Sequence, residues 1–206
     1  MKRLFLALFV LFSVVVTVDA AERDFMKDSG WRKIQLSDVK NPVVFFGKDW
    51  AALAAGKKNA LNAMTVGWGQ FGTLWGRKVV TVYVAPERYT NEFMKKSDYF
   101  TLTAFPADKK EALVYIGNHS GRDGDKLKAA GLTPEFTPLG NPIFKEGNLA
   151  VECKIIYKEQ LKPELMDAKA RLFYETKKAK PHIMYIGEVV NVWKKEANDP
   201  QTSRSL

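Results

Sequence analysis

The chain contains six segments in which β-branched and aromatic residues alternate with polar ones or form short apolar runs. Such segments are typical of β-strands, and glycine, proline or short helical patterns separate them. Because strands dominate and the helical patterns fall between them, the sequence predicts a mainly β barrel with inserted helices rather than a doubly wound sheet. The expected strands are Val43–Phe46, Ala60–Trp68, Val79–Val84, Tyr99–Phe105, Leu149–Tyr157 and Ile183–Trp193.

Three short helices are expected between these strands. Thr90 is the expected N-cap of the first helix, and Gly131 is suited to the left-handed position just after the last one. The stretch from Pro134 to Pro142 is rich in proline and glycine, so we expect an irregular loop of the kind that often covers a ligand or partner. The expected helices span residues 90–97, 107–116 and 123–130.

The N-terminus has the layout of a secretory signal peptide. Two basic residues precede an apolar stretch from Leu4 to Val18, and the small residues Ala20 and Ala21 follow. The apolar stretch is shorter than the roughly 20 residues of a transmembrane helix, and an uncleaved membrane anchor is the alternative. We expect cleavage after Ala20 and export to the periplasm or the medium without a stable anchor. The expected boundaries are 1–20 for the signal peptide, 21–197 for one domain and 198–206 for a flexible tail.

Cys153 is the single cysteine, so an internal disulfide is excluded. It lies in the alternating apolar pattern of an expected strand, which favours a buried thiol over a reactive one. The formal net charge is +9, but the lysines are scattered in pairs without an aromatic-interleaved basic stripe. Nucleic acid is therefore not an expected partner, and solubility best explains the excess of basic residues.

The segment from Asn62 to Gln70 places Gly67 and Gly69 on either side of Trp68 within an expected strand. A glycine inside a strand marks a bulge or a position where another group approaches the backbone closely. The pattern indicates either a binding strand or a bulged core strand that packs the indole, and the residues alone leave both interpretations open.

The segment from Ala85 to Asn91 is a strand end that turns into a helix. Backbone amides and the helix dipole favour an anion at such a position, and Arg88 could add a fork of donors for a phosphate. An ordinary N-cap at Thr90 with a solvated arginine is the alternative, and the residue types alone favour it.

The segment from His119 to Lys126 precedes another expected helix start. Its glycines permit close approach to the backbone, and Arg122 and Lys126 supply positive charge beside Ser120. The segment matches neither a Walker loop, nor an EF-hand calcium loop, nor the dinucleotide fingerprint of a Rossmann fold.

His182 opens the last expected strand, and His119 is the only other histidine. With one cysteine and two histidines no metal site is expected, and without a GxSxG elbow no nucleophilic triad is expected. His182 is then either a structural or solvated residue, which is the commoner case, or a catalytic group.

Taken together and in this order, these segments resemble the flavin reductase-like, FMN-binding split-barrel proteins, in particular their flavoredoxin-like branch. They span residues 62–188, which is most of the expected mature chain. The matching stretches are Asn62-Ala63-Met64-Thr65-x-Gly67-Trp68-Gly69, Gly72-Thr73-Leu74-Trp75-Gly76, Arg88-Tyr89-Thr90, Ser120-Gly121-Arg122-Asp123-x-Asp125-Lys126 and His182-x-Met184-Tyr185-Ile186-Gly187-Glu188.

The resemblance implies an FMN-binding split β-barrel that forms a homodimer with the cofactor near the subunit interface. It implies that the strand of residues 62–69 lies along the isoalloxazine ring, and that the motif of residues 88–90 holds the phosphate end, with Ser120, Arg122 and Lys126 nearby. His182 lies beside the ring or the nicotinamide position and is the expected catalytic residue. The expected cofactor-binding residues are Asn62, Ala63, Met64, Thr65, Trp68, Gly69, Arg88, Tyr89, Thr90, Ser120, Gly121, Arg122, Asp123 and Lys126.

The function that the resemblance implies is an oxidoreductase, either a flavin reductase or a flavoredoxin-type electron carrier. FMN accepts a hydride at N5 and releases electrons singly or in pairs. NAD(P)H is a possible donor, but it is a cytoplasmic metabolite, so an exported protein is expected to receive electrons from a redox partner instead. A flavin-binding or storage protein without turnover is the alternative.

Overall fold

The computed structural model of the chain describes residues 20–39 and 45–195. Nearly all of the expected signal peptide, the first half of the expected strand at 43–46 and the whole expected tail lie outside these residues. Within the described ranges, no helix combines the length and the apolar character needed to cross a bilayer.

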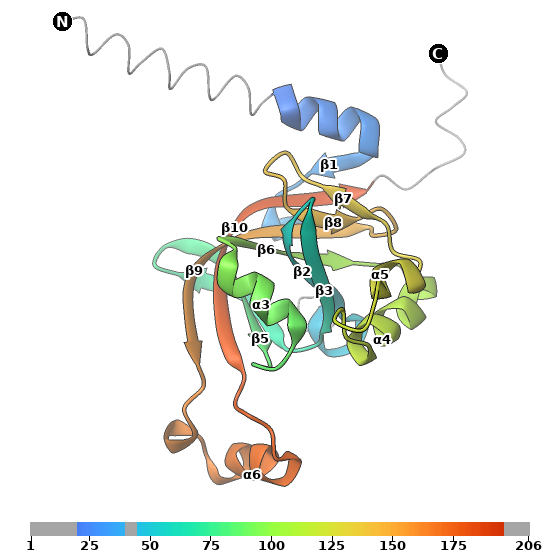
Figure 1. Cartoon of the computed structure of the whole chain (residues 1–206). Helices are drawn as coiled ribbons and strands as arrows, with labels where there is room; N and C mark the ends of the chain where they lie inside the picture. Colours follow the sequence, from blue (N-terminus) through green and yellow to red (C-terminus); the bar gives the residue numbers. More distant parts are fainter. Residues whose placement is uncertain (1–19, 40–44, 196–206) are drawn as a thin grey trace, which may run out of the picture.

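Eight antiparallel strands form one large sheet that curves around an apolar interior (Figure 1). The strand order is β3-β2-β6-β9-β10-β5-β4, and β1 pairs with the far end of β10. β3 and β4 stand at opposite ends of this order although only Gly67 and Trp68 separate them in the chain. The strands of this sheet are β1 (Trp31–Lys33), β2 (Ala51–Lys57), β3 (Ala60–Val66), β4 (Gly69–Leu74), β5 (Arg77–Val84), β6 (Tyr99–Ala104), β9 (Leu149–Gln160) and β10 (Ile183–Lys195).

Five of the six expected strands are confirmed as β3, β5, β6, β9 and β10. The sixth strand was expected at 43–46, and its prediction is wrong for the two residues that the structure describes. Phe45 and Phe46 begin a π-helical turn in which both are buried. β2 was not expected from its alanine-rich sequence. Its first five residues are fully buried between β3 and β6, where alanine allows close packing.

Helices and single turns lie between the strands (Figure 1). The four helices that follow β5 are α3 (Tyr89–Lys96), α4 (Lys110–Asn118), α5 (Lys126–Ala129) and α6 (Ala168–Lys177), and residues 20–29 are also helical. The shorter turns are η1 (Leu36–Asp38), η2 (Phe45–Asp49), η3 (Ala107–Lys109) and η4 (Pro163–Leu165). The three expected helices are thus confirmed, and Gly131 has the expected positive φ, at 66°.

The expected N-cap role of Thr90 is wrong. Arg88 occupies the N-cap position of α3, and Thr90 lies inside the first turn with its hydroxyl accepting a hydrogen bond from Asn62 Nδ2 at 2.8 Å. Because Asn62 is buried on β3, its amide requires a partner, and the Thr90 hydroxyl satisfies it.

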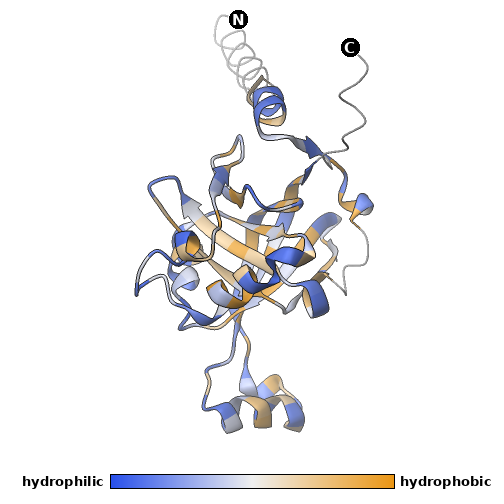
Figure 2. Cartoon of the chain, turned by 90° about the vertical axis from the view of Figure 1, so that its right-hand side faces the viewer, coloured by the Kyte–Doolittle hydropathy of each residue, from blue (hydrophilic) through white to orange (hydrophobic). Residues whose placement is uncertain are grey.

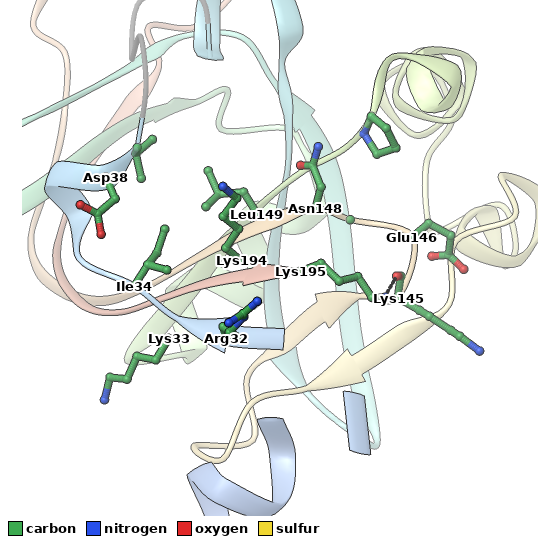
Figure 3. A pocket seen from close by; sticks show the side chains of 13 residues that line it. Arg32, Lys33, Ile34, Asp38, Lys145, Glu146, Asn148, Leu149, Lys194 and Lys195 are labelled. Atoms are coloured by element: carbon green, nitrogen blue, oxygen red, sulfur yellow. Dashed lines mark hydrogen bonds between the residues drawn. The ribbon is translucent and has the colours of Figure 1, made fainter. Parts of the chain in front are cut away.

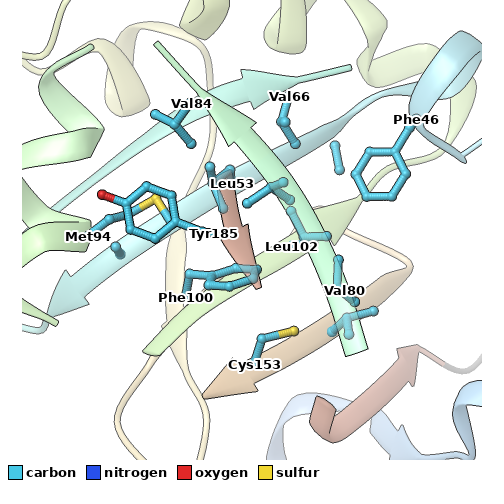
Figure 4. Close-up of a cluster of buried hydrophobic side chains, with 14 of the residues drawn as sticks. Phe46, Leu53, Val66, Val80, Val84, Met94, Phe100, Leu102, Cys153 and Tyr185 are labelled. Atoms are coloured by element: carbon cyan, nitrogen blue, oxygen red, sulfur yellow. The ribbon is translucent and has the colours of Figure 1, made fainter. Parts of the chain in front are cut away.

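The core lies between the curved sheet and α3 (Figures 2 and 4). Hydropathy colouring shows the apolar residues concentrated on the strands in the middle of the molecule, with hydrophilic loops around them. Phe100, Leu102 and Tyr185 are among its fully buried side chains. Cys153 is also fully buried there, as expected, and burial raises the pKa of its thiol well above the usual value.

The expected irregular loop between Pro134 and Pro142 is wrong. This stretch forms a small hairpin of β7 (Pro134–Phe136) and β8 (Pro142–Phe144). The fully buried carboxylate of Glu152 on β9 anchors the hairpin, because it accepts hydrogen bonds from Asn141 Nδ2 at 2.8 Å and from the Thr137 hydroxyl. Asn191 Nδ2 donates the third bond, at 2.7 Å. Buried polar groups of the barrel, rather than a ligand, therefore fix this segment.

A long excursion, residues 161–182, joins β9 to β10 and extends away from the barrel (Figure 1). We call it the arm. Its two ends meet, since the Leu161 amide donates to the His182 carbonyl at 2.9 Å. Asp167 caps α6 by accepting a hydrogen bond from the Ala170 amide at 2.7 Å. Every residue of α6 is at least partly exposed, so the helix depends on its cap and on a few aromatic contacts rather than on a core.

Candidate functional site

A pocket of about 470 Å³ lies between the barrel and the arm. The barrel contributes residues of β3, the β5–α3 turn and α4, whereas the arm contributes Phe173, Lys177, Ala179 and, at its base, His182. Five of the residues predicted from sequence line this one pocket, although they come from three separate motifs. They are Met64, Thr65, Trp68, Arg88 and His182.

β3 forms one wall as an edge strand, because it pairs with β2 on one side and ends the strand order on the other. An edge strand directs alternate backbone N–H and C=O groups away from its partner, where they can bind a ligand. Ala63 is fully buried and packs under α4, so only its backbone could contact a ligand. Thr65 donates its hydroxyl to the Leu113 carbonyl and thereby fixes α4 against the strand.

The motifs of β3, α3 and the loop before α5 converge next to this pocket. Asn62 holds Thr90 through its amide. A Cβ atom on Gly121 would lie 2.3 Å from Asn62 Oδ1 and 3.1 Å from the Tyr89 ring, so only glycine fits there. Four predicted residues from three motifs thus meet in one contact, of which Asn62 and Thr90 are buried, and this explains why these residue types occur together.

Two of the predicted cations close the C-terminal end of α4. Arg88 Nη1 donates to the Gly117 carbonyl at 2.8 Å, and Lys126 Nζ donates to the carbonyls of Ile116 at 2.8 Å and His119 at 3.0 Å. These carbonyls lack partners within the helix, and cations are favourable at its negative end.

Lys126 is buried whereas Arg88 is exposed. Burial, and to a smaller extent the charge of Arg88, together lower the pKa of Lys126 to about 8. Arg88 keeps most of its five N–H donors for a ligand, because the bond to Gly117 uses only one guanidinium nitrogen.

Arg122 lies over the Tyr89 ring, with its guanidinium carbon 4.7 Å from the ring centroid, and pairs with the carboxylate of Glu92. Ser120 accepts a hydrogen bond from the Arg122 amide at 3.2 Å, which shapes the loop. Asp123 is exposed. These three residues lie beside the convergent contact but outside the pocket lining, so the structure separates them from the residues that face the pocket.

Gly69 has a packing explanation of its own. A Cβ atom there would lie 2.5 Å from the Phe46 ring and 2.7 Å from the Thr81 carbonyl. Gly67 borders the pocket instead, and a Cβ on it would lie 3.0 Å from the indole of Trp50. The interpretation as a bulged core strand therefore accounts for Gly69. The interpretation as a binding strand fits the stretch from Thr65 to Trp68, which lines the pocket.

His182 lies at the base of the arm against Trp68, with ring centroids 4.8 Å apart. Its Nδ1 is 3.1 Å from the Tyr174 hydroxyl. Burial lowers the pKa of His182, while Glu87 raises it and Arg88 lowers it. The lowered pKa favours the neutral imidazole at pH 7, and the Tyr174 hydroxyl occupies one of its two ring nitrogens.

The sequence analysis missed the aromatic residues that the arm and η2 bring to the pocket. Phe173 packs on Trp68 at 5.5 Å between ring centroids. Trp50, which has a positive φ of 64°, lies under the ammonium of Lys110 at 3.4 Å, and the same ammonium donates to the Asp49 carbonyl at 3.1 Å. Asp167 followed by helix-forming residues was the signal in the sequence for α6.

A second and larger pocket of about 1030 Å³ lies at the other end of β10, beside β1 (Figure 3). Its lining is basic, with Arg32, Lys33, Lys145, Lys194 and Lys195 against Asp38 and Glu146. As far as the described residues go, no residue from the five sequence motifs lines it. The smaller pocket is therefore the candidate site despite its size, since the convergent polar groups lie there.

Comparison with known families agrees with this geometry. Residues 41–204 match the family described as "Flavin reductase like domain". The chain belongs to the flavin reductase-like family. This membership places it among the flavin-using oxidoreductases. A comparison with curated protein sequences found no match.

Solved structures of this fold superpose on most of the chain. The FMN-binding protein from Thermus thermophilus with bound p-hydroxybenzaldehyde is 20% identical, with a TM-score of 0.58 over 80% of this chain and 83% of the other. Flavoredoxin from Methanosarcina acetivorans is 19% identical, with a TM-score of 0.58 over 80% and 76%. Flavoredoxin of Desulfovibrio vulgaris is 20% identical, with a TM-score of 0.55 over 80% and 78%. At these identities the likeness shows the split-barrel fold.

Proposed function

We propose that the chain binds FMN in the pocket between β3 and the arm and acts as an FMN-dependent oxidoreductase outside the cytoplasm. The observation that carries this proposal is the convergence of an edge strand, an arginine and a histidine from three motifs on one pocket. Relatives of the same fold are FMN-binding proteins and flavoredoxins, which supports FMN as the flavin.

The pocket fits the chemistry of FMN. A planar ring can lie along the open edge of β3, with its polar edge against backbone groups near Thr65. The phosphate then lies toward Arg88, whose remaining donors suit a bidentate contact. Arg122 and Lys126 add positive charge to the same side.

FMN, when bound, supplies hydride and single-electron transfer, and the protein supplies position and electrostatics. In our proposal the Tyr174 hydroxyl donates to Nδ1 of His182, so that the proton of the neutral imidazole is on Nε2. Nε2 then donates a hydrogen bond into the pocket and orients the flavin ring or the electron donor. Trp68 packs on the His182 ring, and Phe173 packs on Trp68 in turn.

Export is part of the proposal because of the N-terminal layout of two basic residues, an apolar stretch and small residues. A nicotinamide donor is scarce outside the cytoplasm, so a protein or membrane redox partner is the favoured electron donor, with NAD(P)H as the alternative. A homodimer is also proposed. Large apolar side chains on the arm support it, since Leu165 is 79% exposed and Leu172 is 60% exposed.

Titration of purified protein with FMN tests the cofactor assignment. We expect quenching of flavin fluorescence at one equivalent per chain and a flavin-coloured protein after gel filtration. A colourless protein that leaves FMN fluorescence unchanged would contradict FMN binding.

Anaerobic reduction of the FMN-loaded protein then separates the possible functions. Bleaching by dithionite but not by NADH or NADPH supports an electron carrier with a redox partner, whereas rapid bleaching by either nicotinamide supports a reductase. His182→Ala should leave FMN bound and slow the reduction, and an unchanged rate would return His182 to a structural role.

A further inference from the structure

The arm supplies part of the pocket lining that the cofactor-binding motifs do not account for. Phe173 and Lys177 lie one helical turn apart on α6 and both line the pocket. The Lys177 ammonium lies 4.5 Å from the centroid of the Phe173 ring, so an aromatic face and a positive charge are presented side by side.

The aromatic surface continues from the arm onto the barrel. Phe173 packs on Trp68 at 5.5 Å, and Trp68 in turn packs on His182 at 4.8 Å. Trp68 is 45% exposed in spite of these contacts, so part of its indole is available to a ligand. The Trp68 ring is tilted by 53° to Phe173 and by 37° to His182, so the three rings form an angled aromatic wall against which a planar aromatic molecule can pack.

The pocket lining has more positive than negative side chains. Glu87, Arg88 and Lys177 are its charged residues, which leaves a net positive pocket. Among the described residues Lys177 forms no ion pair with a carboxylate, whereas Arg122, Arg77, Lys33 and Lys162 each do. Arg88 is on the side of α4 and Gly117, so Lys177 is the cation on the arm side.

We propose that the arm forms the binding site for the second substrate, and that this site selects planar aromatic molecules that carry a negative charge. The inference rests on the proposed FMN function, because the substrate must stack within reach of the flavin. The ring stacks on Phe173 and Trp68, and the anionic group pairs with Lys177. The exposed position of Lys177 makes the ion pair modest and sensitive to salt.

Equilibrium binding to the oxidised, FMN-loaded protein tests the proposal without turnover, and bound FMN keeps the ligand out of the phosphate site. The probes are anthraquinone-2-sulfonate and the neutral 2-(hydroxymethyl)anthraquinone, measured by calorimetry at low salt. We expect tighter binding of the sulfonate. Lys177→Gln should lower the affinity for the sulfonate by about fivefold and change the affinity for the neutral probe by less than about twofold.

Two further variants complete the design. Lys169→Gln is the matched control, since Lys169 is an exposed lysine of α6 that is not part of the pocket lining, and it should leave both probes unchanged. Phe173→Leu should weaken both probes by about fivefold, because it removes the stacking surface but not the charge.

The proposal would be overturned if Lys177→Gln lowered the affinity for both probes equally. It would also be overturned if Lys169→Gln lowered the affinity for the sulfonate as much as Lys177→Gln does. FMN titration of each variant is run in parallel. A change in FMN affinity in Lys177→Gln would assign this lysine to the cofactor instead, and failure of the unmodified chain to bind FMN would locate the fault in the proposed function rather than in the arm.

Discussion

The two sides of the pocket are built in different ways. On the barrel side, Asn62 and Thr90 are buried and hydrogen-bonded to each other, and Gly121 packs against them. On the arm side, every residue of α6 is at least partly exposed, and aromatic contacts to Trp68 hold the helix in place. A substitution in a buried network whose hydrogen bonds are all made lowers stability strongly, whereas a substitution on an exposed helix has little effect on stability. We therefore expect substitutions to have larger effects on the barrel side of the pocket than on the arm side.

The largest effect is expected where the barrel side is tightest. Gly121→Ala places a Cβ atom 2.3 Å from Asn62 Oδ1, so the loop or the strand must shift. We expect a loss of about 1–3 kcal/mol in the free energy of unfolding, measured by urea denaturation, together with loss of most FMN binding. Gly72→Ala is the matched control, because its Cβ would meet nothing within 4 Å and should leave both quantities unchanged. Equal behaviour of the two variants would contradict the tight contact.

Arg88→Ala should weaken FMN binding by about tenfold to a hundredfold, because a charge-assisted contact to the phosphate is lost. Riboflavin lacks the phosphate, so its affinity should change by less than about threefold, and this difference separates a direct contact from damage to α4. Fluorescence titration with the two flavins measures both values. Equal losses would move the phosphate site elsewhere.

A smaller effect is expected from pH. The pKa of Lys126 is lowered to about 8, so this lysine is charged at pH 7 and becomes neutral as the pH rises through 8. The phosphate of FMN stays doubly charged over this range, and its affinity should fall by roughly threefold to tenfold between pH 7 and pH 9.5. Riboflavin affinity should stay level. A parallel fall for both flavins would indicate a conformational change rather than loss of the lysine charge.

The smallest effect on binding is expected on the arm side. Tyr174→Phe keeps the ring but removes the hydroxyl that holds His182 Nδ1. FMN affinity should stay within about twofold, while the rate of anaerobic flavin reduction falls by a few fold. Nitrogen NMR of the His182 ring should show a mixture of tautomers in place of one. An unchanged rate with a single tautomer would show that Tyr174 does not orient the histidine.

The strands that the sequence predicted correctly are those with β-branched residues on a buried face, such as Val79–Val84 and Ile183–Trp193. β2 escaped prediction because its run of alanines has high helix propensity, and only pairing with β3 and β6 forces it to be extended. Phe45 and Phe46 are residue types that favour strands, but they lie in a π-helical turn. There both rings pack against Phe71 of β4. In both cases tertiary packing overrode local preference.

The barrel side of the site was accessible to sequence analysis because its residues occur in ordered motifs. The arm side was not, since Phe173 and Lys177 belong to no motif and reach the pocket only through the path of the β9–β10 connection. Thr90 shows the limit of local rules. Its residue type and position suit an N-cap, but a buried amide on a distant strand takes its hydroxyl instead.

The arm begins and ends at one point of the barrel, where the Leu161 amide meets the His182 carbonyl and Gln160 pairs with Ile183. The barrel strands therefore already form a complete hairpin without the 20 or so residues between them, and a tight turn of about two residues could in principle join them. For protein engineering, the arm is thus a connection that can be replaced without changing the barrel strands. Other loops could be grafted onto the same two strands to give the pocket a new outer wall while the cofactor side is left as it stands.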